Sequence, residues 1–357
     1  MFRLLLYRLK YKVFSFYIIQ NIQKYFINKY LTRFKAKKIK KFIKSKNETF
    51  IFVYDLRISS IAYGDFFQNL ILLKYISIFK RTKIIFIKFS RKNFHHHQSI
   101  SKKEKIKRLL EFTKISKFFL GKKNVQIFNF KKFSEFNKKN LVWEKNKIIK
   151  SIPIYTYSLN TLHYLYEKKN YYKFIISKKD FKNLKLKKKL PQNFITFAIK
   201  YNSNTTSRYR DYTIKEIDSC LEYLYQKYRK YKIIIISDKS TTLILKKLLG
   251  IKKNKILFSK DFGKDFLDDL KICNHSKLFF SYKPSGSSSL VEYSSIPYIC
   301  YHLNKPEFSI FTKNTLPNDL FFNKTIRHPW QTNKQLWLIP INNDLKNTKI
   351  MSKISNV

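Results

Sequence analysis

The sequence predicts an α/β protein in which two parallel sheets, each covered by helices, belong to two successive domains. Three observations support this class. Continuous apolar runs of strand length recur along the chain, helix-length segments separate them, and the alternation starts afresh beyond a basic, proline-terminated linker at residues 182–192. The 357 residues are enough for two domains that each bury a core of their own.

The composition limits the class of protein without naming a partner. Lys and Arg number 75 against 22 Asp and Glu, which gives a formal net charge of +53. A balance of this kind is typical of proteins that bind nucleic acid or anionic membranes. However, the most abundant residues are also those that AT-rich codons specify, so the charge alone assigns no function. We do not expect nucleic acid to be a partner.

Neither the cysteines nor the histidines form a metal-binding pattern. Cys220, Cys273 and Cys300 lie far apart without CxxC spacing, and two of them sit in apolar periodic segments, which predicts reduced, buried thiols in a cytoplasmic protein. The tract His95–His97 has no Cys or carboxylate at ligand spacing, and an exposed loop is expected there. No apolar run reaches the ~18 residues that span a bilayer. We expect no metal, and a cytoplasmic protein that is soluble or peripheral on the inner face of the membrane.

Residues 1–46 alternate apolar side chains with Lys and Arg and contain neither Gly nor Pro, which predicts basic amphipathic helices. Such a helix lies on an anionic membrane surface or packs against the protein's own flank, and the pattern leaves both open. A secretory signal is not expected, because basic residues interrupt the apolar run and no small-residue cleavage site follows.

The first α/β domain is predicted at residues 47–181. The apolar run Thr49–Tyr54 is its first strand, a loop closed by Gly64 and Asp65 opens into an apolar helix, and Lys83–Phe89 is the next strand. Ligands of open α/β sheets bind at the carboxyl ends of the strands. The position of Asp65 therefore fits either a ligand site or a carboxylate that caps the helix.

The rest of this domain is less regular. A capping box at Ser101 and Glu104 predicts a helix that follows at residues 105–119, and residues 125–128 form a strand-like run. Beyond it, the only further element that the pattern predicts before the second domain is a helix at residues 154–166.

The second α/β domain is predicted at residues 193–342, before a polar tail at residues 343–357. A polar loop with Arg208, Arg210 and Asp211 follows its first strand. The predicted strands are 194–199, 232–237, 255–258, 278–282 and 298–301, and the predicted helices are 214–228, 241–249, 262–274 and 289–295.

A small polar turn follows the strand at residues 278–282, and a helix-length segment comes directly after the turn. Backbone N–H groups and the positive end of a helix dipole hold phosphates in such a place. The turn and the helix start contain Ser285, Gly286, Ser287, Ser288 and Ser289. The segment therefore predicts a nucleotide-sugar site.

Two common classes of nucleotide-binding protein do not fit this chain. A dehydrogenase needs G-x-G-x-x-G after an early strand, and none of the five glycines lies in that pattern. The chain also contains no Walker sequence, so ATP hydrolysis is not expected.

The segment from Lys283 to Pro297 resembles the donor-site signature of GT-B fold glycosyltransferases, particularly the heptosyltransferase-like group. Ser285, Gly286 and Pro297 match that signature. In the same signature, Pro284 replaces an acid, Ser289 a His and Ser295 a Gly. Gly64 and Asp65 resemble the N-terminal motif of the same group.

The resemblance implies a GT-B-like fold, in which two Rossmann-like domains with parallel sheets face a cleft. Asp65 would be the general base, and Arg208 and Arg210 would approach the donor phosphates together with residues 285–289. Glu292 would accept the ribose hydroxyls of the donor or would simply be a solvated helix position. The transfer would be inverting and would need neither metal nor cofactor, the nucleotide sugar being the substrate.

The sequence thus predicts a hexosyl- or heptosyltransferase that acts on a cell-surface glycan or lipid-linked acceptor, in lipopolysaccharide or surface polysaccharide biosynthesis. Residues 1–46 would hold it at the anionic membrane surface. Two alternatives stay open. One is a sugar-nucleotide epimerase of similar fold, and the other is a non-catalytic basic protein that binds membrane or RNA on a degenerate GT-B fold.

Overall fold

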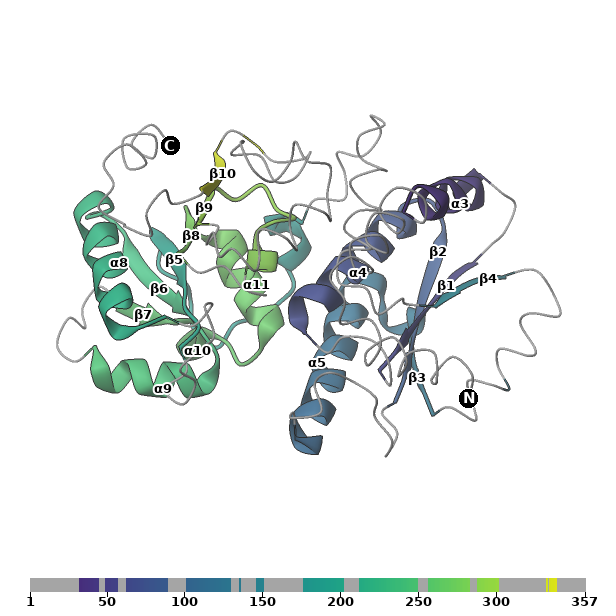
Figure 1. Ribbon diagram of the computed structural model, residues 1–357, viewed down its shortest axis with the longest axis horizontal. Coiled ribbons are helices and arrows are strands. Elements are labelled where there is room, and N and C mark those ends of the chain that lie inside the picture. The colour runs from purple at the N-terminus through teal and green to yellow at the C-terminus, as the bar shows by residue number, and fades with distance from the viewer. Residues whose placement is uncertain are drawn as a thin grey trace, which may run out of the picture. The chain divides into compact units, whose positions relative to one another are not determined.

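The computed structural model confirms the predicted α/β class with parallel sheets (Figure 1). The structure describes residues 32–44, 49–56, 62–88, 101–129, 135, 146–150, 176–201, 212–249, 256–282, 288–301, 332 and 334–338. Contacts divide the chain into two compact units, with the main boundary between residues 174 and 175. The predicted domain bounds and linker 182–192 stay predictions. The predictions for residues 1–31, 95–97, 154–166 and 343–357 lie outside the described residues.

The described part of the first unit contains a sheet of four parallel strands in the order β3-β2-β1-β4. Its elements are α3 (Thr32–Lys44), β1 (Thr49–Asp55), α4 (Tyr63–Ser77), β2 (Arg81–Ile87), α5 (Lys102–Leu120), η2 (Lys122–Asn124), β3 (Val125–Phe128) and β4 (Asn146–Lys150). Ser101 caps α5, as predicted, because its side chain accepts a hydrogen bond from the backbone N–H of Glu104.

The two faces of this sheet bury different kinds of side chain. Alternate residues point to opposite faces of a strand. One face buries an aliphatic set, and the other buries aromatic rings under α4 and α5, which lie on the same side of the sheet in Figure 1. The aliphatic set is Ile51, Val53, Ile85 and Ile87 with Phe128, and the rings are those of Tyr54, Phe66, Phe86 and Phe112. The rings of Phe66 and Phe112 stack at 4.0 Å.

Helix α3 is the described part of the predicted basic amphipathic segment. It buries Ala36 and Ile39 and exposes Lys37, Lys41 and Lys44, so over this stretch the apolar face packs on the protein. In the part of the chain that the structure describes, no helix has the length and hydropathy to cross a bilayer.

The described part of the second unit contains a sheet of six parallel strands in the order β10-β9-β8-β5-β6-β7. Its elements are η3 (Lys178–Phe181), β5 (Phe194–Ala198), α8 (Ile214–Lys227), β6 (Lys232–Ile236), α9 (Lys239–Leu248), β7 (Ile256–Phe258), α10 (Ser259–Phe262), α11 (Phe266–His275), β8 (Phe279–Ser281), η4 (Ser288–Leu290), β9 (Tyr298–Tyr301) and β10 (Gln335–Leu338).

Helices cover both faces of the second sheet, as the continuous apolar strands predict. Ile195 and Phe197 of β5 point toward the core that α8 closes with Ile217 and Leu224. Helix α11 lies on the other side of the sheet (Figure 1), where Thr196 donates a hydrogen bond to Ser276. All three cysteines are buried, as predicted.

Two predicted helices differ in the structure. The helix predicted at residues 262–274 corresponds to α11 but begins only at Phe266, because Gly263 leaves the helical conformation and Asp265 caps α11; Phe262 instead ends the separate short helix α10. The helix predicted at residues 289–295 is only the single 3₁₀ turn η4 followed by hydrogen-bonded turns. A 3₁₀ turn has little dipole to offer, so the predicted anion site would depend on backbone N–H groups rather than on a helix end.

Replacing Gly263 by alanine is expected to destabilise the second unit by about 2 kcal/mol. A Cβ atom at this position would lie 2.3 Å from Cβ of Asp268, which is buried and accepts a hydrogen bond from the N–H of Lys264. Forcing an atom into such a space costs on the order of 1–3 kcal/mol. Chemical denaturation monitored by hydrogen exchange in α11 measures the loss. Lys264→Ala, at the exposed neighbouring position, serves as the control and should change stability by less than about 0.5 kcal/mol.

Candidate functional site

The strand order of the second sheet places a topological switch point between β5 and β8. From β5 the chain passes outward through β6 and β7, then crosses to the other side of β5 and continues through β8, β9 and β10. Neighbouring loops diverge at such a point, and the crevice at the carboxyl ends of the two strands is where open α/β sheets bind ligands. Strands β5 and β8 are parallel neighbours, with Thr196 opposite Phe279.

The loops that leave this switch point are the two segments that the sequence singled out. Residues 202–211, which contain Arg208 and Arg210, follow β5, and residues 283–287, with Ser285, Gly286 and Ser287, follow β8. These two loops lie outside the described residues, but the residues that anchor them are described. Both loops therefore leave the carboxyl ends of two adjacent strands.

Hydrogen bonds tie the starts and ends of these loops together. The N–H of Tyr212 donates to the carbonyl of Lys200 at 2.8 Å, so the loop with Arg208 and Arg210 begins and ends at the tip of β5. The N–H of Tyr282 donates to the phenol oxygen of Tyr212 at 2.7 Å, within a buried contact. Tyr212 thereby links the return of the first loop to the start of the second.

The described end of the segment 283–297 is buried. The hydroxyl of Ser288 donates to Oε1 of Glu292 at 2.5 Å, and Ser288, Ser289 and Glu292 are all buried. With 3% of Glu292 exposed, the alternative of a solvated helix position is wrong. The carboxylate instead orients the first residue of η4, next to the glycine-containing turn.

The first sheet has a switch point of the same kind, between β1 and β4. The chain passes from β1 through β2 to β3 on one side and returns to pair β4 with the other side of β1. The loop that follows β1 leads to α4, which carries Asp65 in its first turn. Asp65 thus follows the strand that borders the switch point, as the predicted β-α-β unit requires.

Asp65 is not the cap residue of α4. That position is occupied by Ala62, whose side chain makes no capping hydrogen bond, and Asp65 is the third residue of the helix. Its side chain is partly buried, and its backbone carbonyl accepts a 2.7 Å hydrogen bond from the amide of Asn69. A carboxylate in the first turn gains from the helix dipole, so both the stabilising and the chemical interpretation remain physically sound.

Some residues around these sites were not singled out from the sequence. The phenol of Tyr63, in the first turn of α4, donates a hydrogen bond to Glu111, and burial followed by this hydrogen bond raises the pKa of Tyr63 above its usual range. In the second unit, Ser281 ends β8 fully buried, and within the described residues its hydroxyl has no hydrogen-bond partner. The only signal for Ser281 is its place at a strand end. No cluster of three or more His, Cys, Asp or Glu with metal-binding geometry occurs among the described residues.

Comparison with known proteins gives structural similarity alone, since no family model and no curated protein matches the sequence. The chain is similar to the E. coli heptosyltransferase WaaC with ADP, at 10% identity and a TM-score of 0.48, over 86% of this chain and 99% of that one. It is also similar to a glycosyl transferase of family 9 from Veillonella parvula, at 11% identity and a TM-score of 0.40, over 87% and 92% of the two chains.

A weaker similarity links the chain to the UDP-GlcNAc 2-epimerase of Methanocaldococcus jannaschii, at 13% identity and a TM-score of 0.29, over 71% of this chain and 83% of that one. At such identities and TM-scores, the function proposed next has to rest on the residues of this chain.

Proposed function

We propose that the protein is a glycosyltransferase that moves a sugar from a nucleotide-sugar donor to a glycan or lipid-linked acceptor of the cell surface. The supporting observation is that Asp65 and the two donor loops, chosen from the sequence, each follow a strand that borders a topological switch point. The strand order, which played no part in choosing these three segments, supports the proposal because ligands of open α/β sheets bind beside a topological switch point.

In the proposed reaction, an acceptor hydroxyl attacks the anomeric carbon of the donor sugar. Asp65 accepts the hydroxyl proton, the new glycosidic bond forms, and the bond between the sugar and the diphosphate oxygen breaks with inversion. The electron pair leaves with the nucleoside diphosphate. Arg208, Arg210 and the backbone N–H groups of residues 285–289 would neutralise that charge without a metal.

Glu292 takes a supporting part in this proposal. Its carboxylate accepts the hydrogen bond of the Ser288 hydroxyl and would thereby fix the start of η4, whose N–H groups would contact the diphosphate. The basic residues of α3 and of the segment before it would hold the enzyme near an acceptor on an anionic membrane surface, at the cytoplasmic face. The donor pocket would select whether the transferred sugar is a hexose or a heptose.

A panel of UDP-, GDP-, CMP- and ADP-sugars tests the donor site by thermal stabilisation. At a concentration near 100 times Kd, the matching donor should stabilise the protein by about 2.7 kcal/mol and raise its Tm by about 5 °C. The Arg208→Gln/Arg210→Gln variant should lose most of this rise, whereas Arg229→Gln, an exposed arginine of the same unit, should keep it. Stabilisation by no sugar nucleotide would refute the donor site, and epimerised donor without transfer would favour the epimerase.

A further inference from the structure

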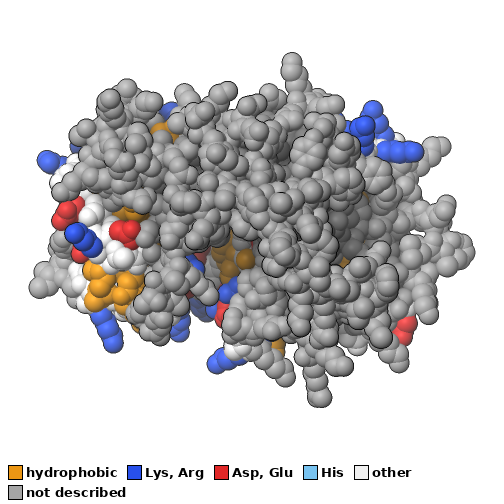
Figure 2. Space-filling model, viewed as in Figure 1, with side chains coloured by type: hydrophobic (Ala, Val, Ile, Leu, Met, Phe, Trp, Pro, Cys, Tyr) orange, Lys and Arg blue, Asp and Glu red, His pale blue; other side chains and the backbone are white. Residues whose placement is uncertain are grey.

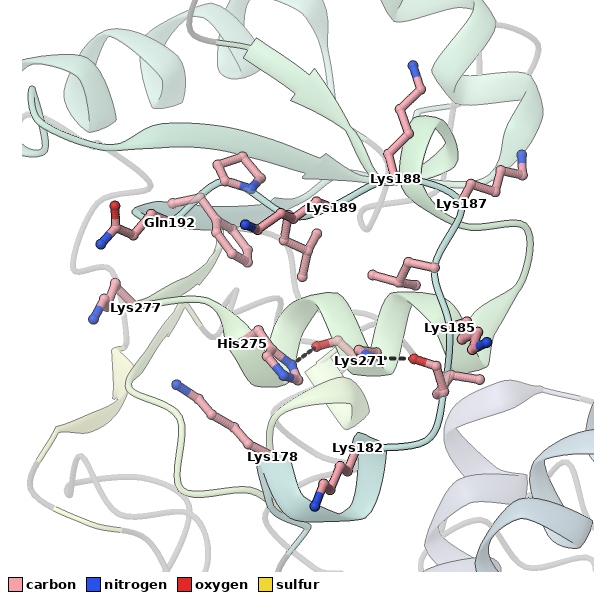
Figure 3. A pocket seen from close by; sticks show the side chains of 15 residues that line it. Lys178, Lys182, Lys185, Lys187, Lys188, Lys189, Gln192, Lys271, His275 and Lys277 are labelled. Atoms are coloured by element: carbon pink, nitrogen blue, oxygen red, sulfur yellow. Dashed lines mark hydrogen bonds between the residues drawn. The ribbon is translucent and has the colours of Figure 1, made fainter.

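The second unit contains a pocket of about 710 Å³ whose charged lining is entirely cationic (Figure 3). Eight lysines and His275 line it, and no Asp or Glu does. Pockets of about 300–1,000 Å³ are typical of sites for small ligands. Six of the lysines come from residues 178–189 and two from the other wall of the pocket, namely Lys271 of α11 and Lys277.

The lysines of residues 178–189 are presented by an ordered backbone, which we call the lysine strap and define as residues 176–192. At its start, the N–H of Ile176 donates to Tyr293 at 2.6 Å, and the ring of Phe181 is fully buried. In the middle, the ammonium of Lys271 donates to the backbone carbonyls of Phe181 and Leu184. The N–H of Lys187 donates to Phe262 at 2.8 Å. The strap is therefore fixed against α11 before any ligand arrives.

The charge of the strap exceeds what the composition of the chain explains. Residues 178–189 contain seven lysines in twelve positions, whereas Lys and Arg make up 75 of 357 residues overall. On the face that Figure 2 shows, Lys and Arg side chains lie at several separate places, some of them beside Asp or Glu. The one acid of the segment, Asp180, is held by the N–H and the hydroxyl of Ser177. Among the described residues, no ion pair joins a carboxylate to a pocket lysine.

The pocket lies at the amino ends of β5 and β8, since Phe194 begins β5 and Lys277 precedes β8. The two loops proposed to bind the donor leave the carboxyl ends of the same two strands. The lysine pocket thus lies at the opposite ends of these strands and is not part of the proposed donor site.

His275 gives the pocket a group that can respond to an anion. Its Nδ1 donates to the carbonyl of Lys271 at 2.8 Å, which leaves Nε2 for the pocket. Burial lowers the pKa of His275, the hydrogen bond to Lys271 opposes this, and the charges of Lys271 and Lys178 lower it further. Figure 3 shows Lys178 and Lys277 on the side of the pocket where the ring of His275 lies, whereas Lys187 and Lys188 extend away from α11.

We propose that the lysine pocket is a binding site for a ligand that carries two or more clustered phosphate groups. Lysine ammonium groups bind phosphate as point charges. When several of them are held close together, a bound anion relieves the electrostatic repulsion between them. A pocket of this size holds a soluble diphosphate compound or the diphosphate headgroup of a lipid. Both offer the same chemistry to the strap.

Isothermal titration of the full chain with inorganic pyrophosphate tests this site. The Lys178→Gln/Lys189→Gln/Lys277→Gln variant should bind pyrophosphate at least about tenfold more weakly and with a smaller dependence on salt, because three charges that contact the anion are gone. Bound pyrophosphate should also raise the NMR-observed pKa of His275, since a phosphate offsets the charges of Lys271 and Lys178. Flotation with vesicles of phosphatidylcholine that contain a polyprenyl diphosphate distinguishes a lipid headgroup from a soluble ligand. Flotation lost in the lysine variant favours a lipid headgroup, and flotation unchanged favours a soluble ligand.

Two further variants separate this site from other sources of binding. Lys215→Gln/Lys230→Gln/Lys247→Gln removes three exposed lysines elsewhere on the second unit and should bind pyrophosphate as the wild type does. Arg208→Gln/Arg210→Gln impairs the proposed donor site and should keep binding in the lysine pocket. Equal weakening by both lysine variants, or loss in the arginine variant alone, would overturn the proposal. An RNA oligonucleotide that binds more tightly than pyrophosphate, with the same loss in the pocket variant, would assign the pocket to nucleic acid instead.

Discussion

Asp65→Asn is expected to lower kcat for sugar transfer by about a thousandfold, in an assay with the donor that the thermal panel identifies. A positioned general base contributes on the order of 10²–10⁴ to the rate, and asparagine keeps the shape of aspartate but cannot take the proton. The KM for the donor should stay within about twofold, because Asp65 is assigned to the acceptor hydroxyl. Initial rates at saturating donor and acceptor measure the change.

A purely stabilising role for Asp65 predicts a different result. Loss of a first-turn carboxylate costs on the order of 0.3–1 kcal/mol of helix stability and leaves the rate nearly unchanged. Asp218→Asn, which replaces a partly buried carboxylate of α8, controls for the general effect of losing one negative charge. Wild-type transfer by Asp65→Asn with a small loss of stability would assign Asp65 to the helix alone.

Phe66→Ala should destabilise the first unit by about 4 kcal/mol. Phe66 is fully buried, and its ring contacts Tyr54 edge-on at 5.6 Å and stacks on Phe112 at 4.0 Å. Truncation of a buried phenylalanine loses both the apolar transfer energy and the packing around the cavity, typically about 3–5 kcal/mol. Because the chain has two compact units, a single unfolding transition is not assumed, and hydrogen exchange of the β1 and β2 amides measures the stability of the first unit by itself.

Phe79→Ala is the matched control for that experiment. It follows the same helix, is 43% exposed and makes an edge contact with Tyr75 at 5.5 Å. Its loss should cost about 1 kcal/mol or less. If the two variants weakened β1 and β2 equally, the aromatic face of the first sheet would not be the source of its stability.

The sequence predicts the central strands and the edge strands β3 and β7, but it misses the edge strands β4 and β10 for a physical reason. Strands β1, β5 and β6 are buried on both faces, so almost every residue is apolar and the run stands out. Strand β4 has only Ile148 and Ile149 between lysines, and β10 begins with a glutamine. Gln335 is buried because its amide donates hydrogen bonds to the carbonyls of Ser294 and Ile296. These contacts join residues far apart in the sequence, so no local sequence pattern predicts them.

The two errors in the second unit have similar causes. The sequence prediction starts the helix at residue 262, whereas Gly263 is extended and the side chain of Asp265 caps α11 at its true start. The prediction of a helix after the Gly/Ser turn treats Glu292 as a helix residue, whereas its hydrogen bond to Ser288 belongs to a short turn. In both places a side chain that contacts a neighbouring turn outweighs local helix preference.

The candidate site is predicted from residue types, but its placement comes from strand order. Gly64, Asp65 and the segment 283–297 are visible in the sequence. The switch points are not, because they depend on pairings such as Thr196 with Phe279, which are far apart in the chain. Roles for Tyr212 and Ser281 follow only once β5 and β8 are known to be neighbours.

The crossing of the chain from β7 to β8 affects how the second unit folds while the chain is being synthesised. During synthesis, β5 can pair with β6 as soon as residue 236 has emerged, but its other edge stays open until β8 follows some time later. An open apolar edge is a template for aggregation, and charges that flank it discourage pairing with other chains. The lysine strap ends just before β5, so the nascent chain exposes this vulnerable edge beside a dense run of positive charge.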